Sequence, residues 1–428
     1  MKTRDLLVVV CFVTLLAAAS RAASPLSAPV SFDVVQHKAF NFFWNQTNPN
    51  TGLTNDRAHN IGPIDAKNDV ASIASTGYAL AALPIGVTHG WITKRQGYVR
   101  ALTTLRFFDT QEPNVHGFYY HFVNAKTGAR VWNCEVSSID TALLIMGARV
   151  AGDYWPGTAV QTLADRLTER VDWRWMETDG GTKSLETAPS MGWYPDKGFI
   201  AVRWQGYNEG IYLYWLALGS KTHAIPAAAW DKWDVATAKV EGVTVPGGPN
   251  PLFMAEMASG FVNLKGMRDR AGRDWWSLWQ NAVLADRAYC LRNPDHFATY
   301  AQNFWGVNAN DMAPPTGYGA GRPVSGGNDG TSSPTAMLAS IIYTPKLAAQ
   351  ALANLSSKHS AQLYGVYGFS NAFNVDKHWY DKDVIGIDLG MMLLAIEDRR
   401  SGMIWNLMHS DATIQRGLLK AGFHATGN

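Results

Sequence analysis

The sequence predicts an all-α fold in which an inner ring of helices is enclosed by an outer ring, an (α/α)6 toroid. Helical periodicity recurs along the chain, and uniformly apolar helices alternate with amphipathic ones. Runs of alternating strand character are few. About twelve helices are expected, at residues 31–46, 69–86, 94–109, 135–151, 158–171, 208–219, 227–236, 274–292, 334–342, 345–357, 387–399 and 401–409. A plain helical bundle or a solenoid is the alternative, but no fixed repeat favours a solenoid.

The clearest inner helices are those at 69–86, which contains S-T-G-Y-A-L-A-A-L, and at 387–399, which contains I-D-L-G-M-M-L-L-A-I. The best strand candidates are 117–123 and 240–245. Clusters of Gly, Pro, Asn and Asp predict long loops, for example at 48–64, 179–198 and 308–333. Loops of this length within a compact domain are usually functional, and in a toroid they would gather at one end and form a cleft.

The N-terminus has the pattern of a secretory signal peptide. Lys2 and Arg4 precede an apolar run at 6–19, and small residues follow at Ser20 and Ala22. The run is shorter than the roughly 20 residues of a membrane span, and no later stretch is long and apolar enough for one. We therefore expect a signal peptide at 1–22, cleaved after Ala22 or Ala23, and a single periplasmic or secreted domain at 23–428.

Composition narrows the function classes. The net charge of +2 is too small for nucleic acid or an anionic membrane, since both need a concentrated basic patch. The 17 Trp, 16 Tyr and 17 Phe residues supply many flat faces, most of them expected in the core. Outside the leader, the cysteines are Cys134 and Cys290, which either pair or remain two buried thiols.

The segment 204–220 places one carboxyl group where a loop enters a buried helix. Residues 211–218 are all apolar or aromatic, and Glu209 precedes them. Glu209 could simply favour the positive end of the helix dipole, which would lower its pKa. A general acid needs a raised pKa, so desolvation would have to outweigh the dipole. We favour a functional role because the residues at the same entrance suit a sugar: Trp204, Gln205, Tyr207 and Asn208.

Other carboxyl groups recur at junctions between loops and helices. They are Glu135, Asp140, Asp329 and Asp388. Asp388 lies among apolar residues, where an unpaired charge is costly. Asp388 could cap a buried helix or pair with Arg57 or Arg399. The alternative is a catalytic role. For Glu135 and Asp140, helix capping and function are equally supported. Two acids that approach one cleft could hydrolyse a glycosidic bond, because one protonates the leaving oxygen and the other activates water or attacks the sugar.

Signatures of other chemistries are absent from the sequence. It contains no H-E-x-x-H or paired C-x-x-C, so no metal or other cofactor is expected. It also lacks G-x-S-x-G, a Walker loop and a dinucleotide fingerprint. The Gly-rich stretch 317–330 lacks the lysine of a phosphate loop and is interpreted as a flexible cleft wall.

Several motifs, in order along residues 32–408, resemble one known family. They are S-I-A-S-T-G-Y, N-C-E-V-S-S-I-D-T-A-L-L, M-G-W-Y-P-D-K-G-F, R-W-Q-G-Y-N-E-G, L-A-L-G-S, N-D-G-T-S-S-P-T-A, Y-G-F-S-N-A-F-N and G-I-D-L-G-M-M. Together they resemble the bacterial glucoamylase-like domain family, which includes the endo-β-1,2-glucanases of glycoside hydrolase family 144. The resemblance implies an exported (α/α)6 enzyme that hydrolyses a β-glucan with inversion and without a metal.

Residue roles follow from the same resemblance. Glu209 corresponds to the general acid and Asp388 to the base, which could reach water through a substrate hydroxyl group. Glu135 and Asp140 match acidic positions that line the cleft. Further residues lie in motifs similar to sugar-contacting loops: Asp56, Arg57, Trp193, Trp204, Asp329 and Trp379.

One segment departs from the pattern of the family. Residues 251–270 read P-L-F-M-A-E-M-A-S-G-F-V-N-L-K-G-M-R-D-R, where relatives tend to have a Gln and His pair before the same R-D ending. The apolar replacements are Met254, Ala255, Met257 and Ala258. Because buried polar contacts discriminate between substrates, the linkage or sugar is left open.

We therefore expect a monomeric inverting endo-glucanase for β-1,2-glucan or a related polysaccharide, with an oligo- or polysaccharide as its only partner. The alternatives are a hydrolase of another glycan or of chain ends, and an inactive glycan-binding protein of the same fold. A lyase on a similar toroid would need a Tyr or His base beside an acidic sugar. The small net charge gives no indication of an acidic substrate.

Overall fold

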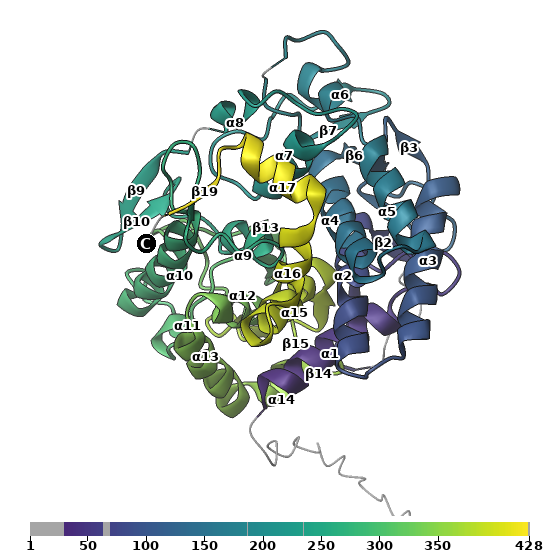
Figure 1. The fold of residues 1–428 in the computed structure, drawn as a ribbon. Helices are drawn as coiled ribbons and strands as arrows, with labels where there is room; N and C mark the ends of the chain where they lie inside the picture. The colour runs from purple at the N-terminus through teal and green to yellow at the C-terminus, as the bar shows by residue number, and fades with distance from the viewer. Residues whose placement is uncertain (1–29, 63–68, 186, 234, 427–428) are drawn as a thin grey trace, which may run out of the picture.

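The computed structural model describes residues 30–62, 69–185, 187–233 and 235–426 (Figure 1). The expected signal peptide lies outside these residues. Within them, no helix combines the length and the apolar character needed to cross a bilayer.

The predicted (α/α)6 toroid is confirmed. Its inner ring consists of helices that are buried along nearly their whole length (Figure 1): α2 (Ile73–Thr88), α4 (Ser138–Tyr154), α7 (Ile211–Gly219), α9 (Phe253–Ser259), α12 (Pro334–Ala339) and α15 (Gly386–Arg400). A short 3-10 turn, η1 (Ser340–Ile342), continues α12. Helices that are apolar on all sides can be stable only when other helices enclose them.

The outer helices enclose this ring and bury one face each. They are α1 (Phe32–Asn45), α3 (Lys94–Thr110), α5 (Ala159–Arg170), α10 (Trp275–Arg292), α13 (Pro345–Lys358), α16 (Met403–Ser410) and α17 (Ala412–Lys420). Four shorter helices complete the described part: α6 (Trp173–Thr178), α8 (Ala229–Lys232), α11 (Ala298–Ala301) and α14 (Ser360–Leu363).

Two glycines bring the inner helices α2 and α4 into backbone contact. A Cβ atom placed on Gly147 would lie 1.8 Å from the carbonyl oxygen of Gly77. Any side chain at Gly147 would therefore push the two helices apart, and the ring would no longer close at this distance.

Short strands precede three of the inner helices. β2 (Val70–Ser72), β6 (Val136–Ser137) and β18 (Asp383–Ile385) lead directly into α2, α4 and α15. The side chains of Ser72 and Ser137 cap α2 and α4. The helices therefore begin later than the predicted positions 69 and 135. Their N-terminal ends, with the polar residues of the strands, lie beside one another.

The strands are short and mostly paired as antiparallel ribbons. The largest sheet has the order β3 (Asn114–Val115), β4 (Phe118–Tyr120), β6, β7 (Gly192–Tyr194) and β8 (Gly198–Phe199). Two-stranded ribbons pair β1 (Arg57–His59) with β18, β2 with β5 (Phe122–Asn124), β9 (Thr237–Val240) with β10 (Val243–Pro246), β11 (Met267–Arg268) with β19 (His424–Ala425), β12 (Ala309–Met312) with β13 (Gly317–Ala320), β14 (Tyr364–Gly365) with β15 (Gly368–Phe369) and β16 (Phe373–Asn374) with β17 (Trp379–Tyr380).

Several predicted boundaries need correction. The single strand expected at 117–123 is two strands, β4 and β5, which are separated at His121. The run 240–245 contains the turn of the β9–β10 hairpin, where Glu241 and Gly242 adopt positive φ angles. The helix expected at 227–236 shortens to α8, because the chain leaves helical geometry at Trp233. Helices α9 and α17 and the short helices α6, α11 and α14 were not predicted.

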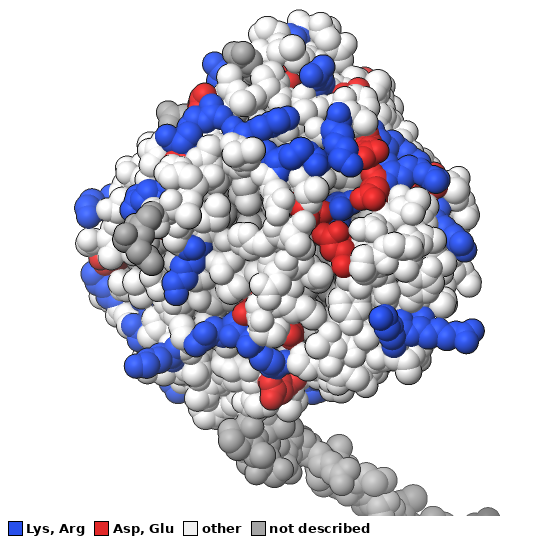
Figure 2. Space-filling view, in the orientation of Figure 1, with Lys and Arg blue, Asp and Glu red and all other residues white. Residues whose placement is uncertain are grey.

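Cys134 and Cys290 are both buried and are not bonded to each other. This agrees with the alternative of two buried thiols. Lys and Arg side chains form a band across the upper part of the face shown in Figure 2, and Asp and Glu side chains lie just right of its centre and in its lower part.

Candidate active site

The candidate site is a cavity of about 660 Å³ at the N-terminal ends of inner helices. It contains carboxyl groups from four parts of the chain: Asp56, Asp140, Glu209 and Asp388. Arg57, His121, Phe122 and Tyr318 also line it, and α9 contributes Phe253 and Met257. A concave site that combines apolar walls with a few convergent ionisable groups is the usual form of a small-molecule or glycan site.

Glu209 is held in a tight turn just before α7. The side chain of Asn208 donates to the carbonyl groups of Gln205 and Gly206 and accepts from the backbone N–H of Gly210. Burial raises the pKa of Glu209 to about 7, although a hydrogen bond from its own backbone opposes the shift. Desolvation therefore outweighs the stabilisation expected from the helix end.

Asp388 lies in the first turn of α15 with 1% of its surface exposed. Its Oδ2 accepts a hydrogen bond of 2.6 Å from Nδ2 of Asn371. The amide oxygen of Asn371, Oδ1, accepts a hydrogen bond from the backbone N–H of Asp311, and this contact fixes the orientation of the Asn371 amide. Burial raises the pKa of Asp388 to about 7, and the Asn371 hydrogen bond acts in the opposite direction.

An ion-paired cluster lies beside Asp388. Nη1 of Arg57 is 2.8 Å from Oδ2 of Asp311, and its Nε is 3.3 Å from Oδ2 of Asp56. The pairing of β1 with β18 brings Arg57 opposite Ile385, three residues before Asp388. The guanidinium charge is close enough to lower the pKa of Asp388, which agrees in part with the expectation of Arg57 as a partner.

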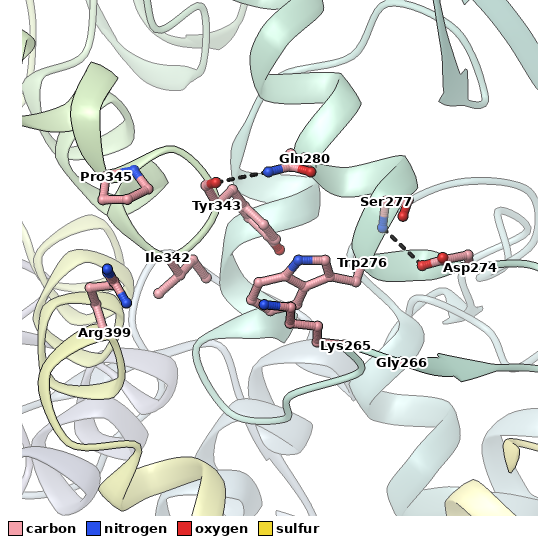
Figure 3. A pocket seen from close by; sticks show the side chains of 10 residues that line it. All are labelled: Lys265, Gly266, Asp274, Trp276, Ser277, Gln280, Ile342, Tyr343, Pro345 and Arg399. Atoms are coloured by element: carbon pink, nitrogen blue, oxygen red, sulfur yellow. Dashed lines mark hydrogen bonds between the residues drawn. The ribbon is translucent and has the colours of Figure 1, made fainter. Parts of the chain in front are cut away.

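Arg399 is at the opposite end of α15 from Asp388. It lines a second cavity of about 500 Å³ with Lys265, Trp276 and Tyr343 (Figure 3). The one carboxyl group in that cavity, Asp274, accepts from the backbone N–H of Ser277 and caps α10. The second cavity therefore lacks the paired acids that hydrolysis of a glycosidic bond requires.

His121 joins Glu135 and Asp140 into one cluster. Its Nδ1 is 2.9 Å from Oε1 of Glu135 and its Nε2 is 3.5 Å from Oδ1 of Asp140. Burial favours the neutral ring, but the charges of Asp140 and Glu135 raise the pKa of His121 to about 9. The hydroxyl group of Ser137 also donates to Asp140, at 2.5 Å.

The same three side chains could offer ligand atoms to a metal ion, since these atoms lie within 4.8 Å of one another. A protonated imidazole has two N–H donors and no free lone pair, so in this state His121 pairs with the two carboxylates. Hydrolysis without a metal stays a prediction.

The remaining predicted site residues lie outside the set that lines the cavity. Trp204 is buried, and its indole donates to the hydroxyl of Ser138 at 2.8 Å. Tyr207 stacks on Trp275. Asp329 pairs with Lys377 at 2.6 Å. Four more do not line it either: Trp193, Gln205, Asn208 and Trp379. Their contact with a sugar stays a prediction for a chain that extends beyond the cavity.

Sequence reasoning missed several residues of the site: His121, Trp132, Asn371, Asp311 and Tyr318. Asn371 lies in the motif Y-G-F-S-N-A-F-N, whose two Asn residues were the available signal. The others gave no local signal, because each gains its neighbours only when distant loops meet at the end of the toroid.

Comparison with known proteins identifies relatives over most of the chain. A family model described as "Putative glucoamylase" matches residues 201–412. A solved structure of a glucoamylase-like protein from Bacteroides caccae is 30% identical, covers 92% of this chain and 99% of its own, and has a TM-score of 0.84. The endo-β-1,2-glucanase of Chitinophaga pinensis, solved with sophorotriose and glucose, is 28% identical, covers 92% and 98%, and also has a TM-score of 0.84.

A curated relative is the exo β-1,2-glucooligosaccharide sophorohydrolase (non-reducing end) of Parabacteroides distasonis. It is 25% identical to this chain over 92% of the chain's length. The chain spans 58% of the length of that relative. The name of the Chitinophaga relative thus describes an endo-acting enzyme, and the name of the Parabacteroides relative describes an exo-acting one.

Proposed function

The chain belongs to the glucoamylase-like family, and from this premise we propose that it is a glycoside hydrolase that cleaves β-1,2-linked glucan. The observation that carries the proposal is the pair Glu209 and Asp388 at one cavity, each with a pKa raised to about 7. An acid that keeps its proton at neutral pH and a second carboxyl group that can take one are what this hydrolysis requires.

We assign the proton donor to Glu209 and the proton acceptor to Asp388. Their pKa values are similar, so neighbouring groups decide the roles. Asn371 donates to Asp388, which favours the anion and therefore a base, and this contact opposes the charges of Asp311 and Asp56. Glu209 has the charge of Asp140 nearby, which favours its protonated form. Glu209 would protonate the leaving oxygen, while Asp388 would take a proton from the attacking water, directly or through a substrate hydroxyl group.

Charged groups around the pair, one guanidinium and three carboxyl groups, are suited to orient the sugar. Asp56, Arg57, Glu135 and Asp140 are proposed to bind its hydroxyl groups, since all but Glu135 line the cavity and Glu135 is held by His121. The apolar replacement Met257 also lines the cavity, whereas Ala255 and Ala258 are buried in the ring. Met257 is therefore the replacement placed to affect which glycan is accepted.

The test is the variant Glu209→Gln with β-1,2-glucan as substrate. It removes the transferable proton with little change in shape, so release of reducing sugar should fall by a factor of about 10² or more. The control is Glu112→Gln, another buried glutamate, which does not line the cavity and should retain activity. Unchanged sugar release by folded Glu209→Gln would overturn the assignment.

The anomer and length of the first products test the remaining claims. An inverting enzyme should release the α-anomer from a β-linked glucan, as followed by NMR during the first turnovers. We propose cleavage within chains, which predicts a broad range of early product lengths. Early release of one uniform disaccharide would instead indicate the exo mode named for the Parabacteroides relative.

Export and a monomeric state are also proposed. The pattern of residues 1–22 supports export. The mature protein should begin at Ala23 or Ser24 and appear in the periplasm or medium, and N-terminal sequencing after cell fractionation would check this. Light scattering at working concentration would test the monomer.

A further inference from the structure

Two exposed aromatic side chains lie at the candidate active site. Among the Trp, Tyr and Phe residues that the structure describes, Trp132 and Tyr318 alone have most of their surface exposed, at 67% and 51%. Both line the cavity that contains Glu209 and Asp388. The other described aromatic side chains are buried or half-buried, so the exposure of these two at one place requires an explanation.

Trp132 is held outward by an unusual backbone. Trp132 and Asn133 have φ angles of 55° and 49°, which place two consecutive non-glycine residues in the left-handed region. The side chain of Arg130 fixes this turn by donating to the carbonyl oxygens of Asn133 and Cys134, each at 2.6 Å. Such conformations persist only where the surroundings impose them, and they are concentrated at functional sites.

Trp132 also continues an aromatic wall that begins at the carboxyl groups. The ring of Phe122 stacks on His121 at 3.9 Å between centroids, and His121 is paired with Glu135 and Asp140. The indole of Trp132 packs against Phe122 at 5.0 Å with an interplanar angle of 61°. The wall therefore extends from the acidic interior to the solvent-exposed rim.

We propose that Trp132 is a binding platform for a glucosyl unit of the substrate, at a subsite on the rim beside the reacting bond. The flat C–H face of a pyranose ring would cover the exposed indole, while its hydroxyl groups stay in water or reach polar neighbours. The platform rests on the proposed function, because it adds a subsite to the same cleft. Tyr318, on the separate β12–β13 hairpin, offers a second exposed ring to the same chain.

The kinetic test compares Trp132→Ala with Trp132→Phe on long β-1,2-glucan. A platform binds the ground state and the transition state equally, so Trp132→Ala should raise KM about tenfold and leave kcat within about twofold. Trp132→Phe should retain most of the affinity because it keeps a flat ring. Leu419→Ala removes another exposed apolar side chain, on α17 and away from the cavity, and should change neither constant.

A binding measurement separates the platform from the chemistry. In the Glu209→Gln background, a β-1,2-glucooligosaccharide should protect exposed tryptophan from quenching by iodide, and Trp132→Phe should remove that protection. If the wild type releases no sugar from β-1,2-glucan, the proposed function fails. If it does, but Trp132→Ala leaves KM unchanged or lowers kcat alone, the platform is wrong and the hydrolase assignment remains.

Discussion

The hydrogen bond from Asn371 to Asp388 allows a direct test of how the proposed base is tuned. Asn371 is itself 1% exposed, and its amide is held by the backbone of Asp311. Replacing it in Asn371→Leu removes the donor and keeps the branched shape of the side chain. Asp388 would then remain buried without that hydrogen bond, so its protonated form would be favoured and its pKa would rise from about 7.

The size of the shift follows from the bond that is lost. A hydrogen bond to a charged group contributes about 1.5–3 kcal/mol, and one pKa unit corresponds to about 1.4 kcal/mol. The pKa of Asp388 should therefore rise by roughly 1–2 units. Because the base acts in its ionised form, activity is lost on the acidic side. The acidic limb of the profile should move to higher pH by the same amount, and activity at pH 7 should fall by about 5- to 50-fold.

The assay is the pH dependence of kcat/KM on β-1,2-glucan, which reports the ionisations of the free enzyme. The matched control is Asn60→Leu. Asn60 is also 1% exposed and donates to the carbonyl of Gly368 and the hydroxyl of Ser370, but to no carboxyl group. Its loss should leave the limb in place. An unmoved acidic limb in folded Asn371→Leu would refute the assignment of Asp388 as the base.

Two further predictions concern stability. Burial raises the pKa of Glu112 from 4.5 to about 8, so the folded protein holds this proton more tightly than the unfolded chain does. The free energy of unfolding therefore includes the full contribution of Glu112 below pH 4.5 and loses it as the pH rises through 8. Glu112→Gln should remove a few kcal/mol of this pH dependence, as measured by urea unfolding at pH 5 and pH 8. Gly147→Ala should lower the free energy of unfolding by at least about 1–3 kcal/mol, because the new methyl group would clash with the backbone of Gly77. The control is Gly152→Ala on the same helix, where the nearest atom would be 3.0 Å from the new methyl group, and its effect in the same unfolding assay should be smaller.

The ring of helices could be predicted because its signal is local. Each long inner helix is apolar on all sides over two or more turns, and α2 and α15 show this in the sequence alone. Helix α9 has seven residues, too few for a periodic pattern, and Pro251 and Gly260 flank it. The segment 251–270 was therefore interpreted only as a change in specificity, although it forms part of the inner ring.

From the residues alone, the site could be predicted where a carboxyl group stands next to an inner helix in the sequence, whereas Asp56 and Arg57, which also line the cavity, were expected from the family resemblance. Glu209 and Asp388 meet this condition, and both line the cavity. His121 does not, because its partners Glu135, just before β6, and Asp140, on α4, are distant from it in the sequence and its protonation depends on their charges. Trp132 was missed because its exposure arises from two left-handed residues, which no short pattern in the sequence specifies.

The inner ring also contains a comparison that shows what keeps a buried carboxyl group in a useful range. Glu256, on α9, is fully buried, and neither of its oxygens has a hydrogen-bond partner among the described residues. Burial raises the pKa of Glu256 well above its usual value. Asp388 is buried to nearly the same extent, but it accepts from Asn371 and has the charge of Arg57 nearby, and its pKa is raised only to about 7. Burial raises both pKa values; at Asp388 the charges of Asp311 and Asp56 add to this effect, and the hydrogen bond from Asn371 and the charge of Arg57 oppose it. At Glu256 the charges of Asp286 and Asp388 add to burial, and no hydrogen bond opposes it. The amide of Asn371 is therefore the main contact that lets Asp388 exchange its proton near neutral pH.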